Sequence, residues 1–202
     1  MIYFRDIVLE TSDDVYEPAE DSFLIAENPI ISPGDVAADI GTGCGICAIA
    51  LASLAKRVLA VDINDHALLL CEKNFRLNRR ENFEVRKSDL FENIHKGEIF
   101  NVILFNPPYI PESGQYPGCD HDMLARSWNG GKGGIEIIKR FVEQVGIHLE
   151  QGGSFYIVIS SLNPVEKVRD IFQENGFKFE KVKSKKLWFE ELFLVKGSRT
   201  CE

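Results

Sequence analysis

The sequence predicts an α/β fold: a seven-stranded, mostly parallel sheet with helices on both faces and an antiparallel hairpin at the C-terminal end. Short apolar runs alternate with amphipathic patterns along most of the 202 residues, which is typical of parallel strands joined by helices. The last two strand-like runs follow each other directly, so we expect them to pair as a hairpin at the sheet edge. The length suits one domain of this kind.

The first thirty residues precede this alternation. Residues 2–10 predict one small strand. The stretch YEPAEDSFLIAEN, residues 16–28, predicts a helix entered through Pro18, with the acidic side chains of Glu20 and Asp21 near its positive end.

The core elements follow in order. Predicted strands occupy residues 36–41, 57–63, 83–89, 101–106 and 153–161, and the two hairpin strands residues 177–189 and 190–197. Predicted helices occupy residues 47–55, 65–78, 135–149 and 164–176. The run 83–89 alternates and favours an edge position, whereas 101–106 is apolar on both faces and favours the centre. We expect a loop from Pro107 to Lys132, and loops of this length usually have a function.

Composition limits the function classes. The formal net charge is −8, and a chain that grips duplex nucleic acid through its phosphates usually presents a basic face. Basic residues at 79–80 and along 181–186 are interpreted as a solvated turn and a wet strand face. No apolar run approaches the roughly 20 residues that cross a bilayer, and the charged N-terminus is unlike a signal peptide. We therefore expect a cytoplasmic protein that binds no membrane and forms no stable complex with nucleic acid.

The five cysteines are irregularly spaced and do not predict a disulfide framework. Cys44 and Cys47 form a C-x-x-C pair, which leaves a redox or metal role open. No second pair completes a zinc site, and the pair lies in a glycine-rich turn that has another explanation, so no metal site is expected.

The segment DIGTGCG places Asp39, Gly41, Gly43 and Gly45 between a predicted strand and a predicted helix. Glycine permits tight turns and lets a ligand approach the backbone. The spacing differs from the G-x-G-x-x-G dinucleotide fingerprint, and a carboxylate beside the loop suits a cationic ligand better than a pyrophosphate. S-adenosyl-L-methionine (SAM), with a sulfonium and an ammonium, is such a ligand. A plain strand–helix turn is the alternative.

Two further acids end the next two predicted strands. Asp62 lies where nucleotide-binding sheets hold ribose hydroxyls. Asp89 can accept a hydrogen bond from an adenine amino group while Leu90 covers the ring. Each acid alone could be an ordinary strand-end residue, but acids at three successive strand ends together indicate a nucleoside-type ligand.

The strand 101–106 ends in Asn106, Pro107, Pro108 and Tyr109. If it lies beside the first core strand, these residues adjoin the glycine loop, at the edge where α/β sheets bind ligands. A planar NH2 group is a poor nucleophile because its lone pair is delocalised, and it improves when fixed acceptors hold both hydrogens. The Asn106 side-chain oxygen and the Pro107 carbonyl can be those acceptors, while the prolines remove competing donors and Tyr109 stacks on the substrate. A turn without function is the alternative.

The NPPY sequence with the D-x-G-x-G-x-G loop resembles the Rossmann-like class I SAM-dependent methyltransferases that modify planar amino groups. VYEPAEDSFLIAE (15–27) and SWNGGKGGIEIIKRF (127–141) are similar to the HemK-type archaeal and eukaryotic subfamily, whose catalytic subunit N5-methylates the glutamine of the GGQ motif in the class 1 peptide chain release factor. The resemblance spans essentially the whole chain. It implies one methyltransferase domain over residues 1–202, with residues 1–30 as an N-terminal extension that borders the SAM pocket.

Carried over by position, the resemblance implies site residues. The implied SAM-binding residues are Ser22, Asp39, Gly41, Gly43, Asp62, Asp89, Leu90 and Asn106. The implied substrate-binding residues are Asn106, Pro107, Pro108 and Tyr109, of which Asn106, Pro107 and Tyr109 are catalytic. Tyr16, Pro18 and Glu20 are expected to border the pocket. Eukaryotic members often have Glu where this chain has Asp39, so the same role is served with a shorter reach.

The resemblance also implies partners. The class 1 release factor is the implied substrate. Eukaryotic members form half of a heterodimer with a small zinc-binding activator subunit, and bacterial relatives carry an extra N-terminal docking domain that this sequence does not contain, which favours such a partner here. Two alternatives stay open: an adenine-N6 or guanine-N2 methyltransferase acting on DNA or RNA, and a non-catalytic SAM-binding protein. The acidic charge argues against the first, and the intact NPPY sequence argues against the second.

Overall fold

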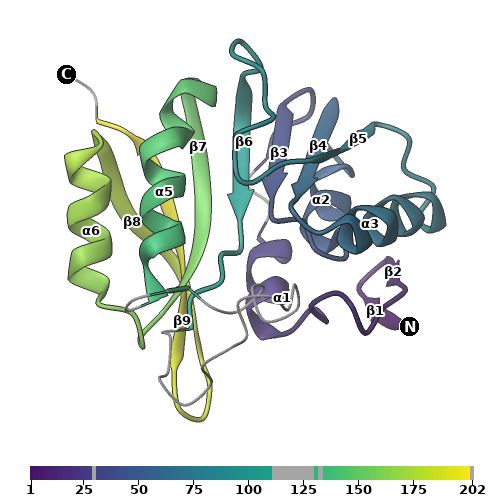
Figure 1. Cartoon of the computed structure of the whole chain (residues 1–202), viewed down its shortest axis with the longest axis horizontal. Helices are drawn as coiled ribbons and strands as arrows, with labels where there is room; N and C mark the ends of the chain where they lie inside the picture. The colour runs from purple at the N-terminus through teal and green to yellow at the C-terminus, as the bar shows by residue number, and fades with distance from the viewer. Residues whose placement is uncertain (29–30, 111–129, 132–133, 201–202) are drawn as a thin grey trace.

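The computed structural model describes residues 1–28, 31–110, 130–131 and 134–200, and it contains the predicted seven-stranded sheet (Figure 1). The order across the sheet is β5-β4-β3-β6-β7-β9-β8, and only β9 runs antiparallel to both of its neighbours. The strands are β3 (Val36–Ile40), β4 (Arg57–Asp62), β5 (Phe83–Lys87), β6 (Phe100–Phe105), β7 (Leu149–Ser160), β8 (Phe177–Lys186) and β9 (Glu191–Arg199). The predicted central strand, edge strand and C-terminal hairpin are thereby confirmed.

Helices cover both faces of the sheet, as predicted. They are α1 (Glu20–Ala26), α2 (Ile46–Leu51), α3 (Asp65–Leu77), α5 (Glu136–Val145), the 3-10 turn η3 (Gly146–His148) and α6 (Val165–Glu174). The apolar side chains of α1, α2 and α3 form one core, and those of α5 and α6 form a second. Strand β6 serves both, because Val102 and Leu104 point into the first core while Ile103 and Phe105 point into the second.

Small side chains let α2 pack close to its neighbours. All six of its residues are buried. A Cβ atom added at Gly45, the N-cap of α2, would lie 2.8 Å from the Cys71 sulfur on α3, so only glycine fits there. The helix predicted over 47–55 is shorter in the structure, because the chain leaves helical geometry after Leu51 and turns before β4.

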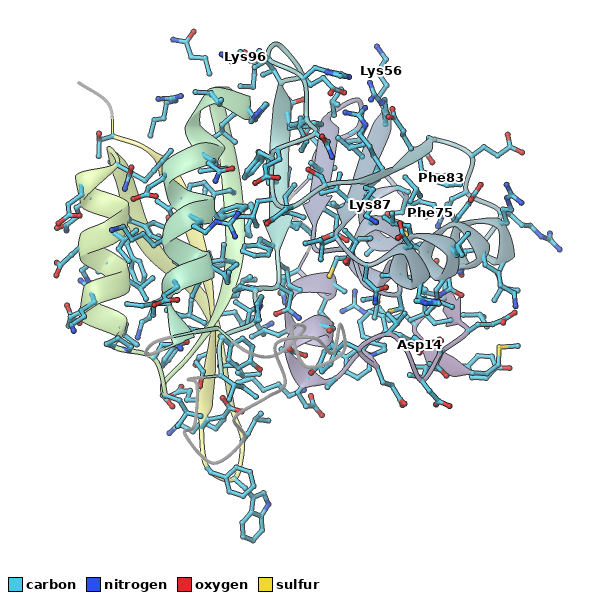
Figure 2. All side chains as sticks on the ribbon, viewed as in Figure 1. Asp14, Lys56, Phe75, Phe83, Lys87 and Lys96 are labelled. Carbon is cyan, nitrogen blue, oxygen red and sulfur yellow. The ribbon has the colours of Figure 1, made fainter. Side chains whose placement is uncertain are left out.

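Helix α3 holds the edge strand β5 and the N-terminal segment. The Phe75 ring of α3 stacks on the Phe83 ring of β5 with 4.1 Å between centroids (Figure 2). The side chains of Asn74 on α3 and of Asn78, its C-cap, accept hydrogen bonds from the backbone of the N-terminal segment at residues 10 and 8. These contacts fix the N-terminal segment against helix α3.

Three predicted elements need correction. Residues 2–10 form two short antiparallel strands, β1 (Ile2–Phe4) and β2 (Ile7–Leu9), because the backbone reverses at Arg5 with φ 53°. Strand β7 begins at Leu149 rather than at residue 153, and its pairing with β6 is irregular between Phe100 and Val102. The helix predicted over 135–149 ends at Val145 and continues as η3. Most of the loop predicted from 107 to 132 lies outside the described residues, as does much of the SWNGGKGG stretch.

Candidate active site

A cavity of about 520 Å³ opens at the carboxyl ends of the central strands, within the usual size range of small-molecule sites. Strand β6 lies beside β3, with Phe105 opposite Ile40, so Asn106 follows directly beside Gly41. The sequence-predicted cofactor and substrate residues all line this cavity: Ser22, Asp39, Gly41, Gly43, Asp62, Asp89, Leu90, Asn106, Pro107, Pro108 and Tyr109. Residues far apart in the chain therefore converge on one hollow.

The Asp62 carboxylate fixes the conformation of the glycine loop. Gly41 and Gly43 have φ values of 67° and 54°, in the left-handed region that favours glycine. The Gly43 N–H donates to Asp62 Oδ2 at 2.9 Å, and the Asn64 N–H donates to Asp62 Oδ1 at 2.9 Å. With two oxygens, the carboxylate has about four acceptor sites, so it keeps capacity to accept from a ligand. Burial raises the pKa of Asp62 above its ordinary value.

Asp39 is the most enclosed acid of the cavity, with 2% of its surface exposed. Its Oδ2 accepts from the Thr42 hydroxyl at 2.7 Å and from the Ala48 N–H at 3.1 Å. Burial raises the pKa of Asp39 to about 7, although both hydrogen bonds oppose the shift. Because a nearby cation favours the ionised carboxylate, this position suits a positively charged ligand group.

Asp89 and Leu90 form the wall beyond β5. Leu90 has φ 49°, a conformation that costs a non-glycine residue about 1 kcal/mol or more. The Ser88 hydroxyl donates to the Leu90 carbonyl at 2.9 Å and holds this turn. Asp89 pairs with Arg140 of α5 at 3.1 Å. Helix α5 packs against the segment after β5 on the same face of the sheet, so it orients this carboxylate. Sequence reasoning did not identify Arg140.

The Asn106 amide has a defined orientation. Its Nδ2 donates to Asp21 Oδ2 at 3.1 Å and to the Ser22 hydroxyl at 3.3 Å. A flipped amide would bring Oδ1 against the Asp21 carboxylate, which is repulsive. Within the described part of the chain, Asn106 Oδ1 is buried and has no hydrogen-bond partner. An orphaned buried acceptor beside a cavity is a group that a ligand donor can satisfy.

Asp21 connects the residues around this amide and was missed as a site residue. It is 5% exposed and also accepts from the hydroxyls of Tyr16 at 3.3 Å and Tyr109 at 3.4 Å. Burial and the negative charge of Asp21 raise the pKa of both tyrosines, so both remain hydroxyl donors at neutral pH. The only signal in the sequence is a carboxylate next to Ser22, which is equally explained as an acidic residue near the positive end of a helix.

Of the three residues expected to border the pocket, two do so and one does not. Tyr16 and Pro18 line the cavity, but Glu20 does not. The expectation for Glu20 is wrong because helix α1 turns its side chain outward, where it pairs with Lys185 of β8. Asn163, which is buried and follows β7, donates to the Tyr109 carbonyl at 2.7 Å and so fixes the backbone after NPPY.

The C-x-x-C cysteines also lie at this cavity. Cys44 and Cys47 are both buried free thiols. Burial raises the pKa of Cys44 to about 12 and that of Cys47 well above its ordinary value, which disfavours the reactive thiolate.

Across the described ranges, no cluster of His, Cys, Asp and Glu is arranged to hold a metal ion, and no helix is long and apolar enough to cross a membrane.

Comparisons with known proteins agree with this geometry. A candidate protein N5-glutamine methyltransferase of Methanocaldococcus jannaschii is 38% identical over 200 residues, covering 98% of this chain and 99% of its own. The eRF1 methyltransferase catalytic subunit of Schizosaccharomyces pombe is 25% identical, covering 93% of this chain and 90% of its own.

Solved structures show the same fold. The structure of the E. cuniculi Mtq2–Trm112 complex responsible for methylation of the eRF1 translation termination factor matches with a TM-score of 0.72 and 25% identity, over 93% of this chain and 99% of that chain. The family resemblance stated from the NPPY and glycine-loop motifs is thereby confirmed. With residues 22–186 matching its characteristic domain, the chain belongs to the methyltransferase small domain family.

Proposed function

We propose that this enzyme transfers a methyl group from SAM to the side-chain amide nitrogen of the glutamine in the GGQ motif of a class 1 peptide chain release factor. One aligned relative is named as a candidate protein N5-glutamine methyltransferase and another as the catalytic subunit of an eRF1 methyltransferase, and both align along nearly the whole chain. The observation that carries the proposal is the orphaned Asn106 Oδ1, an acceptor at the cavity next to two prolines that have no N–H to occupy it. This arrangement suits a substrate NH2 group.

The donor groups of the cavity fit SAM. Asp39 and the glycine loop suit the cationic methionine end, Asp62 suits the ribose hydroxyls, and Asp89 with Leu90 suits the adenine. Ser22 and Asn106 complete the set that we assign to the cofactor. When bound, SAM supplies an electrophilic methyl group on its sulfonium.

The NPPY residues hold the acceptor nitrogen in this proposal. Asn106 Oδ1 and the Pro107 carbonyl would each accept one hydrogen of the substrate amide and hold the nitrogen out of the amide plane, so that its lone pair is less conjugated with the carbonyl group. Pro108 stiffens the turn, and the Tyr109 ring stacks on the planar amide. Asp21 is a positioning residue, because it acts through the Asn106 amide rather than on the substrate. Catalysis then depends mainly on position and on fixed dipoles.

We also propose a small zinc-binding activator subunit as a partner. Strand β5 pairs only with β4, so its other edge has no strand neighbour in the described chain. An exposed edge is usually covered, and a partner can cover it by adding a strand. Leu69 on the adjoining α3 is 67% exposed and offers apolar surface for the same contact.

The remaining assignments follow from the substrate. Release factors act in translation, so the enzyme belongs in the cytoplasm.

We assign residues 1–202 to one methyltransferase domain, in which residues 1–30 border the SAM pocket. In support, Val15, Tyr16, Pro18, Asp21 and Ser22 line the cavity.

A competition assay tests the substrate class. The purified enzyme, with the activator if one co-purifies, is offered labelled SAM together with the host release factor, duplex DNA and tRNA in separate reactions. The proposal predicts label in the release factor, lost when the GGQ glutamine is replaced by another residue. Label in DNA or tRNA alone would replace this proposal with a nucleic-acid methyltransferase.

A further inference from the structure

The hairpin of β8 and β9 ends in two exposed aromatic residues. Trp188 is 96% exposed and Phe189 87% exposed, more than any other large apolar side chain that the structure describes. We call this pair the aromatic tip. In Figure 1 the hairpin reaches past the ends of the other strands, in the direction in which the arrow of β6 points. The aromatic tip therefore extends from the same edge of the sheet as the active site.

The two residues of the aromatic tip are unusual for the turn of a short hairpin. The Leu187 N–H donates to the Glu190 carbonyl at 2.8 Å, so Trp188 and Phe189 are the two central residues of the loop. Glycine, asparagine and aspartate dominate these positions because of their backbone freedom and short polar side chains. Neither aromatic ring is buried, so neither contributes to a core. Residues that are unfavourable for their local structure and add no packing are typical of functional positions.

Contacts on both sides connect the hairpin end to the active site. Lys185 pairs with Glu20, the residue before Asp21, and Glu190 accepts a hydrogen bond from the Ser160 hydroxyl at the end of β7. The charge of Glu190 also contributes to the raised pKa of Tyr109. Trp188 lies three residues beyond Lys185, which corresponds to about 10 Å of extended chain. The aromatic tip thus projects beyond elements that border the cavity, α1 and the end of β7, without lining the cavity itself.

An exposed apolar side chain and an exposed cation lie close to the aromatic tip in the chain or in the fold. Leu162 is 52% exposed and lies in the turn after β7, where the Ser161 N–H donates to the Glu191 carbonyl at 2.8 Å. Lys186 is exposed and makes no ion pair with any residue that the structure describes. The end of the hairpin and the adjoining turn therefore offer two aromatic rings, one aliphatic side chain and one cation.

We propose that the aromatic tip is the docking element for the protein that carries the methylated glutamine, inserting into an apolar hollow of that protein with a carboxylate placed for Lys186. This inference rests on the proposed function. Exposed aromatic side chains often supply most of the binding energy of a protein interface. A membrane is the less favoured occupant, because a bilayer at this edge would cover the opening through which a protein substrate must reach Asn106.

The test replaces both aromatic residues in the full chain, as Trp188→Ser with Phe189→Ser. Tyr3→Ser is the matched control, because Tyr3 is 74% exposed on β1, outside the proposed contact, and is not among the N-terminal residues that line the cavity. Measurements are the Kd for the intact release factor, the steady-state constants with that protein, and the Kd for SAM. We expect the Kd and the KM for the release factor to rise at least about tenfold in the double variant, with kcat and SAM affinity within about twofold. The control should match wild type.

Several outcomes would overturn the inference. An unchanged KM in a wild-type enzyme that methylates the release factor would remove the aromatic tip from docking while leaving the proposed function intact. A fall in kcat alone would assign the tip to catalysis. Tip-dependent sedimentation of the wild-type enzyme with anionic phospholipid vesicles, without an effect on KM, would make it a membrane element. A wild-type enzyme that never methylates the release factor would reject the proposed function, and the docking inference with it.

Discussion

Replacement of Asp21 by asparagine probes how the active site orients its central amide. The Asp21 carboxylate receives one hydrogen of the Asn106 NH2 group at 3.1 Å, and only this orientation leaves Oδ1 toward the substrate. The substituted side chain would have nearly the same shape but could present either its oxygen or its own NH2 group. The Asn106 amide would then populate both orientations, and its flipped form would offer a donor where the substrate needs an acceptor.

The size of the effect follows from the lost hydrogen bond. A hydrogen bond to a charged group contributes roughly 1.5–3 kcal/mol. The length of 3.1 Å to Asp21 is at the long end of the normal range, and that of 3.3 Å to Ser22 lies just beyond it, so we take the lower value. About 1.5 kcal/mol corresponds to roughly a tenfold fall in the rate of methyl transfer. SAM affinity should change by less than about threefold, because the Asn106 amide remains in place.

Single-turnover methylation of the release factor at saturating SAM measures this rate without product release. Glu20→Gln is the matched control, since it makes the same chemical change one residue earlier on α1, at a carboxylate that pairs with Lys185 outside the cavity. We expect the control to stay within about twofold of wild type. If Asp21→Asn is as active as Glu20→Gln, Asp21 does not position the amide and the reasoning is refuted.

Three further predictions follow from the same geometry. Asp62→Ala should weaken SAM ten- to a hundredfold by calorimetry, because a charged hydrogen bond contributes roughly 1.5–3 kcal/mol; unchanged affinity would remove Asp62 from the site. The pKa of Asp39 is raised to about 7 in the folded protein and is near 4 in the unfolded chain. The contribution of Asp39 to the free energy of unfolding without ligand is therefore fully present below about pH 4 and is lost as the pH rises through 7. SAM should favour the ionised form, so its affinity should rise about tenfold from pH 6 to pH 8, and Asp39→Asn should flatten that profile; an equal rise in the variant would contradict the assignment. Adding the activator should slow hydrogen exchange in residues 65–89, and unchanged exchange there would move the interface elsewhere.

The fold could be predicted closely because its pattern is local. Apolar residues on both faces of 101–106 required a central strand, and the structure places them in two separate cores. The acids at strand ends could be predicted for the same reason, because parallel strands bring their carboxyl ends to one edge. The N-terminal hairpin was not predicted, because Asp6 is the only common turn residue between its two three-residue strands and Arg5 takes a left-handed conformation that is unusual for a residue other than glycine.

The parts of the site that could not be predicted depend on long-range contacts. Asp21 and Asn106 are 85 positions apart, and their hydrogen bond exists only because α1 packs at the end of β6. The same holds for Asn163 with Tyr109 and for Arg140 with Asp89. Periodicity describes which face of an element is buried, but it does not indicate which polar side chains meet across elements.

The most direct test of the central proposal is mass spectrometry of the release factor from host cells that carry either the wild-type gene or the Asn106→Ala allele. Asn106→Ala removes the Nδ2 hydrogen bonds to Asp21 and Ser22. Asp21 still accepts from the Tyr16 and Tyr109 hydroxyls and from the Ser22 N–H, so the variant should fold and accumulate normally. The proposal predicts one methyl group on the GGQ glutamine in wild-type cells and none in cells with the variant. A methylated glutamine in the variant strain, or an unmodified glutamine in the wild type, would contradict it.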